Sequence, residues 1–462
     1  MVAGMKPFDY RDFDALALAL PDEIDFLRRS GDFAGEIGAI DALLAQGVHL
    51  GEDMKRRLWF ERVIAQGMLQ DYQMNTAGFL AELRRRYPRC DEQTVQRLLQ
   101  SGHVDTIFVG GERRFQGDAV ANIFARAKKL LEETEHPGTV YTYEPDTERL
   151  ENMRLMRERG SRAFRYHVRF SLTVDEGARR DGKKLRVWLP APAMCAAQSD
   201  IQIVRASAPV SISDAVQPTV YFESMDASEH FFVEYSYVQT AHYHALDDAA
   251  VSADQPHFDT EEMWPHIQFT PVIRALAKEL RGNERNPLRI ARRFYEYITR
   301  NVKYSYMREY RLIENLSQFC AVNRRGDCGV QALLFIALCR CVGIPARWES
   351  GNTVKPSGYL GSHDWAMFYV APYGWLYADP SVGGGALREG CEELCDYYFG
   401  NLDPFRMVCA NDVQQPFAPT KTFLRDDPYD NQTGEAEYED APLHYEDLTR
   451  SKRLLAAQEL DG

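Results

Sequence analysis

Residues 326–338 read Gly-Asp-Cys-Gly-Val-Gln-Ala-Leu-Leu-Phe-Ile-Ala-Leu, an apolar run with one cysteine at its start. Asp327 is a favourable N-cap, so Cys328 is predicted to be the first residue of a helix that ends at Gly343 and Pro345. The positive end of the helix dipole favours thiolate over thiol, and the thiolate is the nucleophilic form. The carboxylate of Asp327 opposes this effect, so a nearby imidazolium is needed to stabilise a thiolate.

An imidazole and a carboxylate follow downstream, each at the edge of a predicted strand. His363 opens an apolar run that extends to Val370, and residues 372–374 (Pro-Tyr-Gly) predict a turn. The returning strand covers residues 375–378 and is followed directly by Asp379. A hairpin places the imidazole near the carboxylate, which can hold it by a hydrogen bond. The imidazole can then serve the thiol as a base and later as an acid.

These segments resemble the core of the transglutaminase-like superfamily, a papain-like group of cysteine enzymes, in the form found in bacterial-type transglutaminase-like domain proteins. The resemblance covers about residues 265–400 and implies a catalytic triad of Cys328, His363 and Asp379. One departure is Met367, where many members carry an acidic residue. The motif parts occur in order as Gly326-Asp327-Cys328, Gly343-Ile344-Pro345-Ala346-Arg347, His363-Asp364-Trp365, Gly374-Trp375 and Asp379-Pro380.

The resemblance implies acyl transfer through a thioester. Cys328 would attack a carboxamide or peptide carbonyl, His363 would protonate the leaving amine or ammonia, and Asp379 would orient His363. Members of the family often use a side chain upstream of the cysteine in the oxyanion hole, and Tyr304 is our candidate, with Tyr306 and a purely packing role as alternatives. We expect hydrolysis rather than cross-linking, with a protein or peptide as substrate and no cofactor or metal. The non-enzymatic alternative is an inert transglutaminase-like scaffold that binds peptides.

Other cysteines and histidines admit simpler interpretations. Taken alone, Cys328 is equally well a core thiol, and we expect Cys320, Cys339 and Cys341 to be core thiols. Two sets of residues could suggest a zinc site. One set is Cys391, Cys395 and Cys409, and the other is His242 with His244. A zinc site is not favoured, because neither set has a second pair of ligands at suitable spacing.

The pattern of hydrophobic residues predicts an α+β protein with four regions. Residues 1–160 are mainly helical, and residues 161–248 alternate with period two, as in an antiparallel β domain. The papain-like, transglutaminase-like catalytic core covers residues 262–400, and residues 401–462 form an acidic C-terminal extension. Within that extension we predict an edge strand over residues 434–438 and a terminal helix over residues 451–460.

The composition of the chain limits which partners and which cellular compartment we expect. The chain has 462 residues and a net charge of -14, which argues against non-specific binding to nucleic acid. Two short helices followed by a hairpin at Gly110-Gly111 also fit a winged-helix DNA module, although a structural helical domain is the simpler interpretation. No membrane span or signal peptide is predicted, so we expect no membrane partner; the oligomeric state is left open. Nine scattered cysteines and a reactive thiol suit the reducing cytoplasm.

Overall fold

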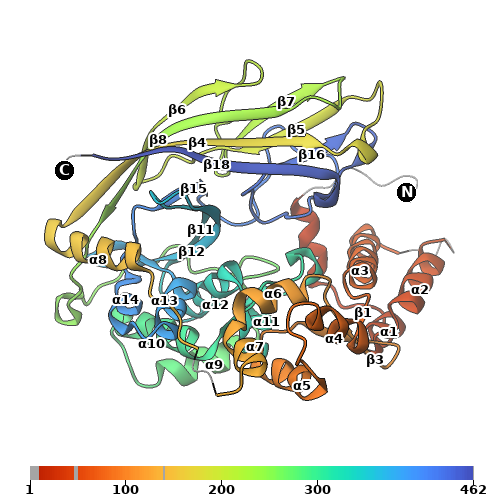
Figure 1. Cartoon of the computed structure of the whole chain (residues 1–462), viewed down its shortest axis with the longest axis horizontal. Helices are drawn as coiled ribbons and strands as arrows, with labels where there is room; N and C mark the ends of the chain where they lie inside the picture. Colours follow the sequence, from red (N-terminus) through yellow and green to blue (C-terminus); the bar gives the residue numbers. More distant parts are fainter. Residues whose placement is uncertain (1–9, 46–49, 139–140, 461–462) are drawn as a thin grey trace.

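The computed structural model describes residues 10–45, 50–138 and 141–460. Two antiparallel sheets form the upper layer of Figure 1, and most helices lie below them. A third sheet, which carries the candidate site, lies between the upper layer and the central helix α12 (Cys328–Cys341). The protein therefore has the predicted α+β class, with separate helical and antiparallel β regions.

The N-terminal region is helical, as predicted, with one small sheet ordered β1-β3-β2. Strands β2 and β3 form the predicted hairpin, and Gly110 and Gly111 at its turn have φ values of 57° and 81° that glycine adopts easily. The elements are η1 (Tyr10–Ala17), α1 (Asp22–Ser30), α2 (Phe33–Ala45), α3 (Glu52–Asp71), β1 (Met74–Asn75), α4 (Thr76–Arg84), α5 (Glu92–Ser101), β2 (Thr106–Val109), β3 (Glu112–Phe115), α6 (Ala119–Arg126), α7 (Lys128–Glu135) and α8 (Thr147–Arg159).

Two four-stranded antiparallel sheets, ordered β18-β4-β8-β6 and β17-β16-β5-β7, form the β region. Alternate residues of β4 are buried between them, which is the period-two pattern of the sequence. The strands are β4 (Ser161–Val174), β5 (Leu185–Pro190), β6 (Gln198–Ala206), β7 (Thr219–Ser224), β8 (Phe231–His242), β16 (Glu435–Tyr438), β17 (Ala441–Pro442) and β18 (Leu448–Leu460), with the short turns η2 (Glu176–Ala178), η3 (Asp248–Ala250) and η5 (Tyr445–Asp447).

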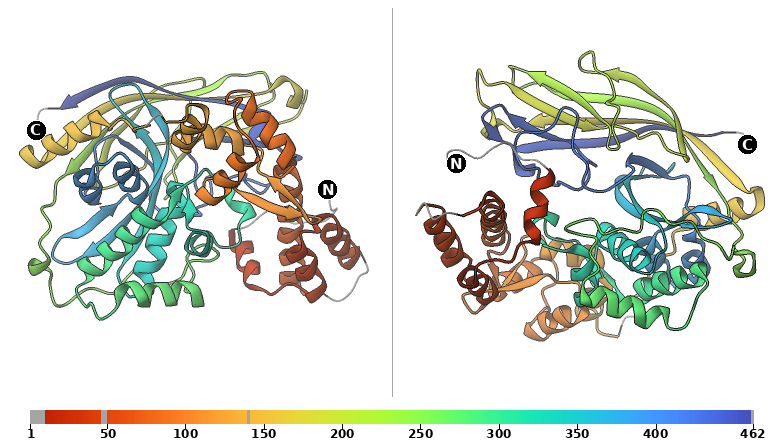
Figure 2. Two further views of the ribbon diagram at one scale, coloured as in Figure 1. Left: turned by 60° about the horizontal axis from the view of Figure 1, so that its bottom comes forward. Right: turned by 180° about the vertical axis from the view of Figure 1, so that it is seen from behind.

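The C-terminal extension contributes strands to both of these sheets. The predicted terminal helix over residues 451–460 is wrong, since this segment belongs to strand β18, which pairs antiparallel along almost the whole of β4. Figure 2 shows this strand running along the β layer. Its leucines and alanines favour helix intrinsically, but the ladder of hydrogen bonds to β4 outweighs that preference. The predicted strand at residues 434–438 is present as β16, but it is not an edge strand, since it lies between β5 and β17.

The core around α12 contains a five-stranded antiparallel sheet ordered β14-β13-β12-β11-β15. Thr270 and Asn286 cap α9 and α10, and each is followed by proline at the first helical position. The elements are α9 (Pro271–Arg281), α10 (Pro287–Asn301), β9 (Lys303–Tyr304), η4 (Tyr310–Leu312), α11 (Leu316–Asn323), β10 (Arg325–Gly326), β11 (Ala346–Val354), β12 (Leu360–Val370), β13 (Gly374–Ala378), α13 (Pro380–Arg388), α14 (Glu392–Tyr397), β14 (Phe399–Gly400) and β15 (Arg406–Ala410).

Two local features complete this core. Three successive glycines at 383–385 would ordinarily favour a turn, but they lie inside α13. A Cβ atom at Gly383 would lie 1.9 Å from the hydroxyl of Tyr295, so close helix packing explains that glycine. The connection between the two long strands is short, because β11 continues to Val354 and β12 begins at Leu360.

Candidate active site

Cys328 is the first residue of α12, as the sequence predicts. Asp327 is the N-cap, and its carboxylate accepts a hydrogen bond of 3.1 Å from the backbone N–H of Val330. The next residue must be glycine, because a Cβ at Gly329 would lie 2.4 Å from the Tyr310 hydroxyl and 2.9 Å from Oδ2 of Asp364. The helix start is therefore packed tightly against the residues that follow His363.

The predicted hairpin brings His363 and Asp379 together. In the register of β12 and β13, Ala366 pairs with Ala378, so Asp379 falls opposite Trp365, and His363 lies two residues further along β12 on the same face. His363 Nε2 and Asp379 Oδ2 are 2.7 Å apart. The carboxylate accepts this bond, so a neutral His363 carries its proton on Nε2 and presents Nδ1 as the basic nitrogen.

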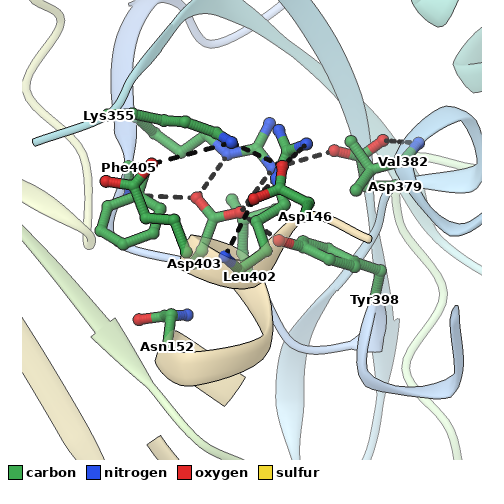
Figure 3. Close-up of polar contacts among 12 residues, drawn as sticks. Asp146, Asn152, Lys355, Asp379, Val382, Tyr398, Leu402, Asp403 and Phe405 are labelled. Carbon is green, nitrogen blue, oxygen red and sulfur yellow. Dashed lines mark hydrogen bonds and ion pairs between the residues drawn. The ribbon is translucent and has the colours of Figure 1, made fainter. Parts of the chain in front are cut away.

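Arg406 lies behind this pair and is fully buried. Its guanidinium is 3.0 Å from Asp379 and forms two hydrogen bonds of 3.1 Å with Asp403. Figure 3 shows the buried network to which Asp379 and Asp403 belong, extending to the pair of Asp146 and Lys355. A charged pair buried at this depth is costly to break, so Asp379 is held firmly in place.

The β region holds Arg406 in position. The phenol of Tyr237 donates to the backbone oxygen of Arg406 at 3.2 Å, and the phenol of Tyr166 donates to that of Pro404 at 3.1 Å. The side-chain amide of Gln198 donates to the backbone oxygen of Val408 at 2.8 Å and accepts from the backbone N–H of Val408 at 2.9 Å. The β region thus fixes the strand that supports Asp379.

The thiol of Cys328 has two side-chain partners among the residues that the structure describes, and neither is His363. It donates to Oδ2 of Asp364 at 3.4 Å, and it accepts a long contact of 3.9 Å from the Tyr304 hydroxyl. Asp364 follows His363 directly on β12. The structure therefore brings the three predicted residues to one region and pairs two of them, while the thiol points to the neighbour of His363.

Electrostatics keep both reacting groups neutral in this arrangement. Burial raises the pKa of the Cys328 thiol well above its usual value, and the carboxyl groups of Asp364 and Asp327 raise it further. Burial also lowers the pKa of His363, with Asp379 opposing the shift and Arg406 adding to it. Burial alone would raise the pKa of Asp379, but His363 and Arg406 hold it well below its usual range. The effect of the helix dipole is therefore outweighed, and Cys328 and His363 are both neutral, as a thiol and an imidazole.

A group of buried acids surrounds the thiol. Burial raises the pKa of Asp364 to about 8, with Asp430 hydrogen-bonded to it and Asp327 adding repulsion. Burial likewise raises the pKa of Asp327 to about 6. Gln432, from the segment before β16, donates to Oδ1 of Asp364 at 2.6 Å and to the backbone oxygen of His363 at 3.2 Å. The C-terminal extension thus reaches the site, a role that the sequence did not reveal.

A cavity of about 460 Å³ lies beside His363. His363 and Tyr304 line it, and so do Lys355, Ser357 and Tyr359 from the turn between β11 and β12. Cys328 is 8% exposed, and its sulfur contacts the hydroxyl of Tyr304, which lines the cavity. Tyr304 therefore lies between the cavity and the thiol.

Tyr304 takes the place predicted for a donor beside the thiol. Burial raises its pKa well above the usual value, so the phenol stays protonated and able to donate. The helical N-terminal region fixes this segment, because His103 Nδ1 lies 3.1 Å from the backbone oxygen of Tyr304 and Asn122 accepts from the backbone N–H of Tyr306 at 3.2 Å. The Tyr306 side chain is exposed and contacts Arg126 instead.

Comparisons with known proteins agree with this core. A model of the transglutaminase-like superfamily matches residues 274–380, which include Cys328, His363 and Asp379. The likeness to this superfamily, whose members are generally cysteine enzymes, therefore covers the segment that holds all three residues.

Among solved structures, a "putative cysteine protease" from Cytophaga hutchinsonii is 14% identical with a TM-score of 0.42, over 65% of this chain and 92% of that chain. The periplasmic domain of TgpA from Pseudomonas aeruginosa is 19% identical with a TM-score of 0.27, over 56% of this chain and 98% of that one. No curated protein matches the chain. Within the described residues, no helix has the length and apolar character needed to cross a bilayer.

Proposed function

We propose that this protein is a cysteine-dependent acyl-transfer enzyme that cleaves a carboxamide or peptide bond. The observation that carries the proposal is the pair of His363 and Asp379, joined at 2.7 Å, with the free Nδ1 of His363 beside a cavity and Cys328 at the start of the adjacent helix. A hydrogen-bonded carboxylate that fixes the imidazole tautomer is the arrangement that thiol nucleophiles use.

The charge state favours general-base catalysis over a preformed ion pair. The thiol of Cys328 turns from Asp364 toward His363, and Nδ1 takes its proton as the sulfur attacks the carbonyl carbon. The negative charge that develops on the carbonyl oxygen is stabilised by the backbone N–H of Cys328 and the phenol of Tyr304. The imidazolium, stabilised by Asp379, then gives its proton to the leaving nitrogen, and a thioester remains on the enzyme.

Water completes the proposed reaction. Neutral His363 takes a proton from water, the hydroxide attacks the thioester carbonyl, and the same proton returns to the sulfur as a carboxylic acid leaves. We place hydrolysis before cross-linking because water is the most abundant acceptor in an open cavity. The nine unpaired cysteines fit a reducing compartment, and we place the reaction in the cytoplasm, on a protein or peptide substrate, without nucleic acid, membrane or cofactor.

A second candidate is a transglutaminase-like module that binds peptides without reacting. The burial of the Cys328 thiol and its hydrogen bond to Asp364 favour this alternative. In that case the cavity beside His363 binds a peptide whose carbonyl carbon never reaches the sulfur.

Alkylation by iodoacetamide, followed at each cysteine by mass spectrometry from pH 6 to pH 10, separates the two candidates. We expect Cys328 to react in the parent and to react at least about tenfold more slowly in His363→Ala, because the general base is lost. Cys391, which is partly buried, serves as the control in the same sample and should be unaffected. Peptide and amide substrates are then screened, with Cys328→Ala as the inactive reference. An inert Cys328 together with no turnover would establish the binding module.

A further inference from the structure

The cavity beside His363 is cationic, in contrast to a chain whose net charge is -14. Two carboxylates, those of Asp146 and Glu389, line it together with four cationic side chains, which are Arg126, Arg149, Lys355 and Arg388. Such a concentration of positive charge in an acidic protein needs a structural partner or an anionic ligand.

Two of the four cations have structural partners. Lys355 pairs with Asp146 and lies 3.8 Å from Glu148. Arg149 pairs with Asp146 at 3.1 Å and lies 3.8 Å from Asp403. These contacts continue into the buried network behind Asp379, which Figure 3 shows around Asp146 and Asp403. They account for Lys355 and Arg149 as parts of the scaffold.

Within the ranges that the structure describes, Arg126 and Arg388 differ from Lys355 and Arg149 in having no acidic partner. In the described part of the chain, neither has a carboxylate within ion-pair distance, and Arg388 has no hydrogen bond there either. Arg126, the last residue of α6, lies over the rings of Tyr304 at 4.1 Å and Tyr306 at 5.0 Å, and donates to the Tyr306 hydroxyl at 3.2 Å. Its Nε is buried and has no partner among the described residues.

Arg388, the last residue of α13, lines the same cavity. Arg388 is exposed to solvent on one side, yet the surrounding protein and the nearby Arg126 guanidinium both lower its pKa. Two guanidinium groups that line one cavity repel each other, and an anion bound between them relieves that repulsion. Planar guanidinium groups match the geometry of a carboxylate, with two parallel N–H donors for its two oxygens.

We propose that Arg126 and Arg388 form a carboxylate-binding subsite, so that the preferred acyl donors are peptides with an acidic group next to the bond that is cleaved. This inference rests on the proposed function and names its substrate class. The spacing comes from Tyr304, whose ring packs against Arg126 and whose hydroxyl contacts the sulfur of Cys328. One tyrosine ring thus separates the anion site from the nucleophile, a distance that an acidic side chain or a free C-terminal carboxylate spans.

The subsite is tested first by binding, which requires no turnover. Calorimetric titration uses N-acetylglutamate α-methylamide for a side-chain carboxylate, N-acetylalanine for a terminal carboxylate, and N-acetylglutamine α-methylamide as the neutral isostere. We expect at least one of the two anions to bind at least about tenfold more tightly than the neutral probe. This preference should fall by at least about fivefold in Arg126→Gln and in Arg388→Gln, and should be retained in part in Arg388→Lys. Arg453→Gln, an exposed arginine on β18, is the control.

The second measurement compares iodoacetate with iodoacetamide at Cys328. The ratio of their alkylation rates should exceed the ratio for free glutathione in the same buffer, and should fall toward it in Arg126→Gln and Arg388→Gln. Equal binding of anionic and neutral probes in the parent, or an anion preference that both glutamine variants retain, would overturn the subsite. Anion binding together with an unreactive Cys328 would support the subsite and refute the proposed catalysis, so the two failures are distinguishable. Thermal unfolding of each variant identifies a substitution that disturbs folding, and Arg388→Lys then provides the comparison.

Discussion

The thiol of Cys328 and the carboxyl group of Asp364 are joined by a hydrogen bond of 3.4 Å. Asp364 is adjacent in sequence to His363, so the sulfur is held one residue away from the base that the proposed mechanism requires. This contact keeps the thiol protonated, and the negative charge that Asp364 acquires at high pH opposes thiolate formation further. The reactivity of Cys328 should therefore depend on Asp364 as well as on His363.

Asp364→Asn should lower the pH at which Cys328 becomes reactive. The pKa of Asp364 is raised to about 8, so its negative charge develops mainly above that pH and delays ionisation of the thiol in the parent. Asparagine carries no charge, and the midpoint of the alkylation profile should shift downward by roughly one pH unit or more. Site-resolved alkylation from pH 6 to pH 11 measures this shift, with the exposed Asp254→Asn as control. A midpoint that stays in place or rises would show that Asp364 does not control the thiol.

The same group makes stability depend on pH. The folded-state pKa of Asp364 is about 8, above the ordinary value of 3.8, so between about pH 4 and pH 8 the native state holds a proton that the unfolded state has released. The free energy of unfolding should therefore fall as pH rises through this window. In Asp364→Asn the slope should be shallower by up to about 1.4 kcal/mol per pH unit. Denaturant unfolding at pH 5, 6, 7 and 8 tests this, and parallel slopes in the two proteins would contradict it.

Local signals made part of the site predictable. The N-cap at Asp327 and the apolar run after it place Cys328 at a helix start without any knowledge of distant residues. The turn after Val370 sets the hairpin register, and that register alone brings His363 near Asp379. In each inference, the residues involved are no more than sixteen positions apart in the sequence.

Long-range contacts made the remainder unpredictable. Arg406 reaches Asp379 from a strand that the tyrosines of the β region hold in place, and no periodicity encodes that contact. Gln432 lies 68 residues from Asp364, in the region that the sequence predicted only as an acidic extension. Residues 448–460 favour helix locally but form β18, because a partner strand nearly 300 residues earlier supplies the hydrogen bonds. Only tertiary structure decides such cases.

Arg406→Met should destabilise the fold strongly. The substitution leaves Asp379 and Asp403 buried without their shared cation, and removing one partner of a buried ion pair costs about 3–5 kcal/mol of unfolding free energy. Arg154→Met is the matched control, since Arg154 pairs with Glu151 and Glu158 on the exposed face of α8, and its loss should be much smaller. Equal losses in the two variants, measured by denaturant unfolding, would show that the network around Asp379 does not stabilise the core.

The same substitution should raise the pKa of His363, because Arg406 contributes to lowering it. The milder Arg406→Lys keeps a cation near Asp379 and should give a smaller rise. Titration of ¹³C-labelled histidines by NMR measures both shifts, with His363→Gln used to assign the resonance. An unchanged His363 pKa in a folded Arg406→Met protein would contradict the electrostatic role of Arg406.

Tyr304→Phe should slow turnover of any substrate that the peptide screen identifies. The phenol contacts the Cys328 sulfur at 3.9 Å, and a donor that stabilises the oxyanion contributes about 10²-fold to kcat with little change in KM. Tyr221→Phe, on strand β7, removes a phenol far from the cavity and should leave kcat unchanged. A rise in KM with an unchanged kcat for Tyr304→Phe would instead assign the tyrosine to substrate binding.

Gln432→Ala should increase the reactivity of Cys328 toward small reagents. Gln432 fastens the segment before β16 to Asp364 and to the backbone of His363, at 2.6 and 3.2 Å, so its side chain restrains the residues that hold the thiol. Losing about 1 kcal/mol of hydrogen bonding should raise the population of conformations that expose the sulfur by about fivefold, and alkylation should accelerate accordingly. Site-resolved alkylation with iodoacetamide at pH 8 measures the rate, and Gln415→Ala in the same segment serves as the control. An equal acceleration in the two variants would attribute the effect to general loosening of the segment, whereas an effect confined to Gln432→Ala would identify this contact as the restraint on the nucleophile.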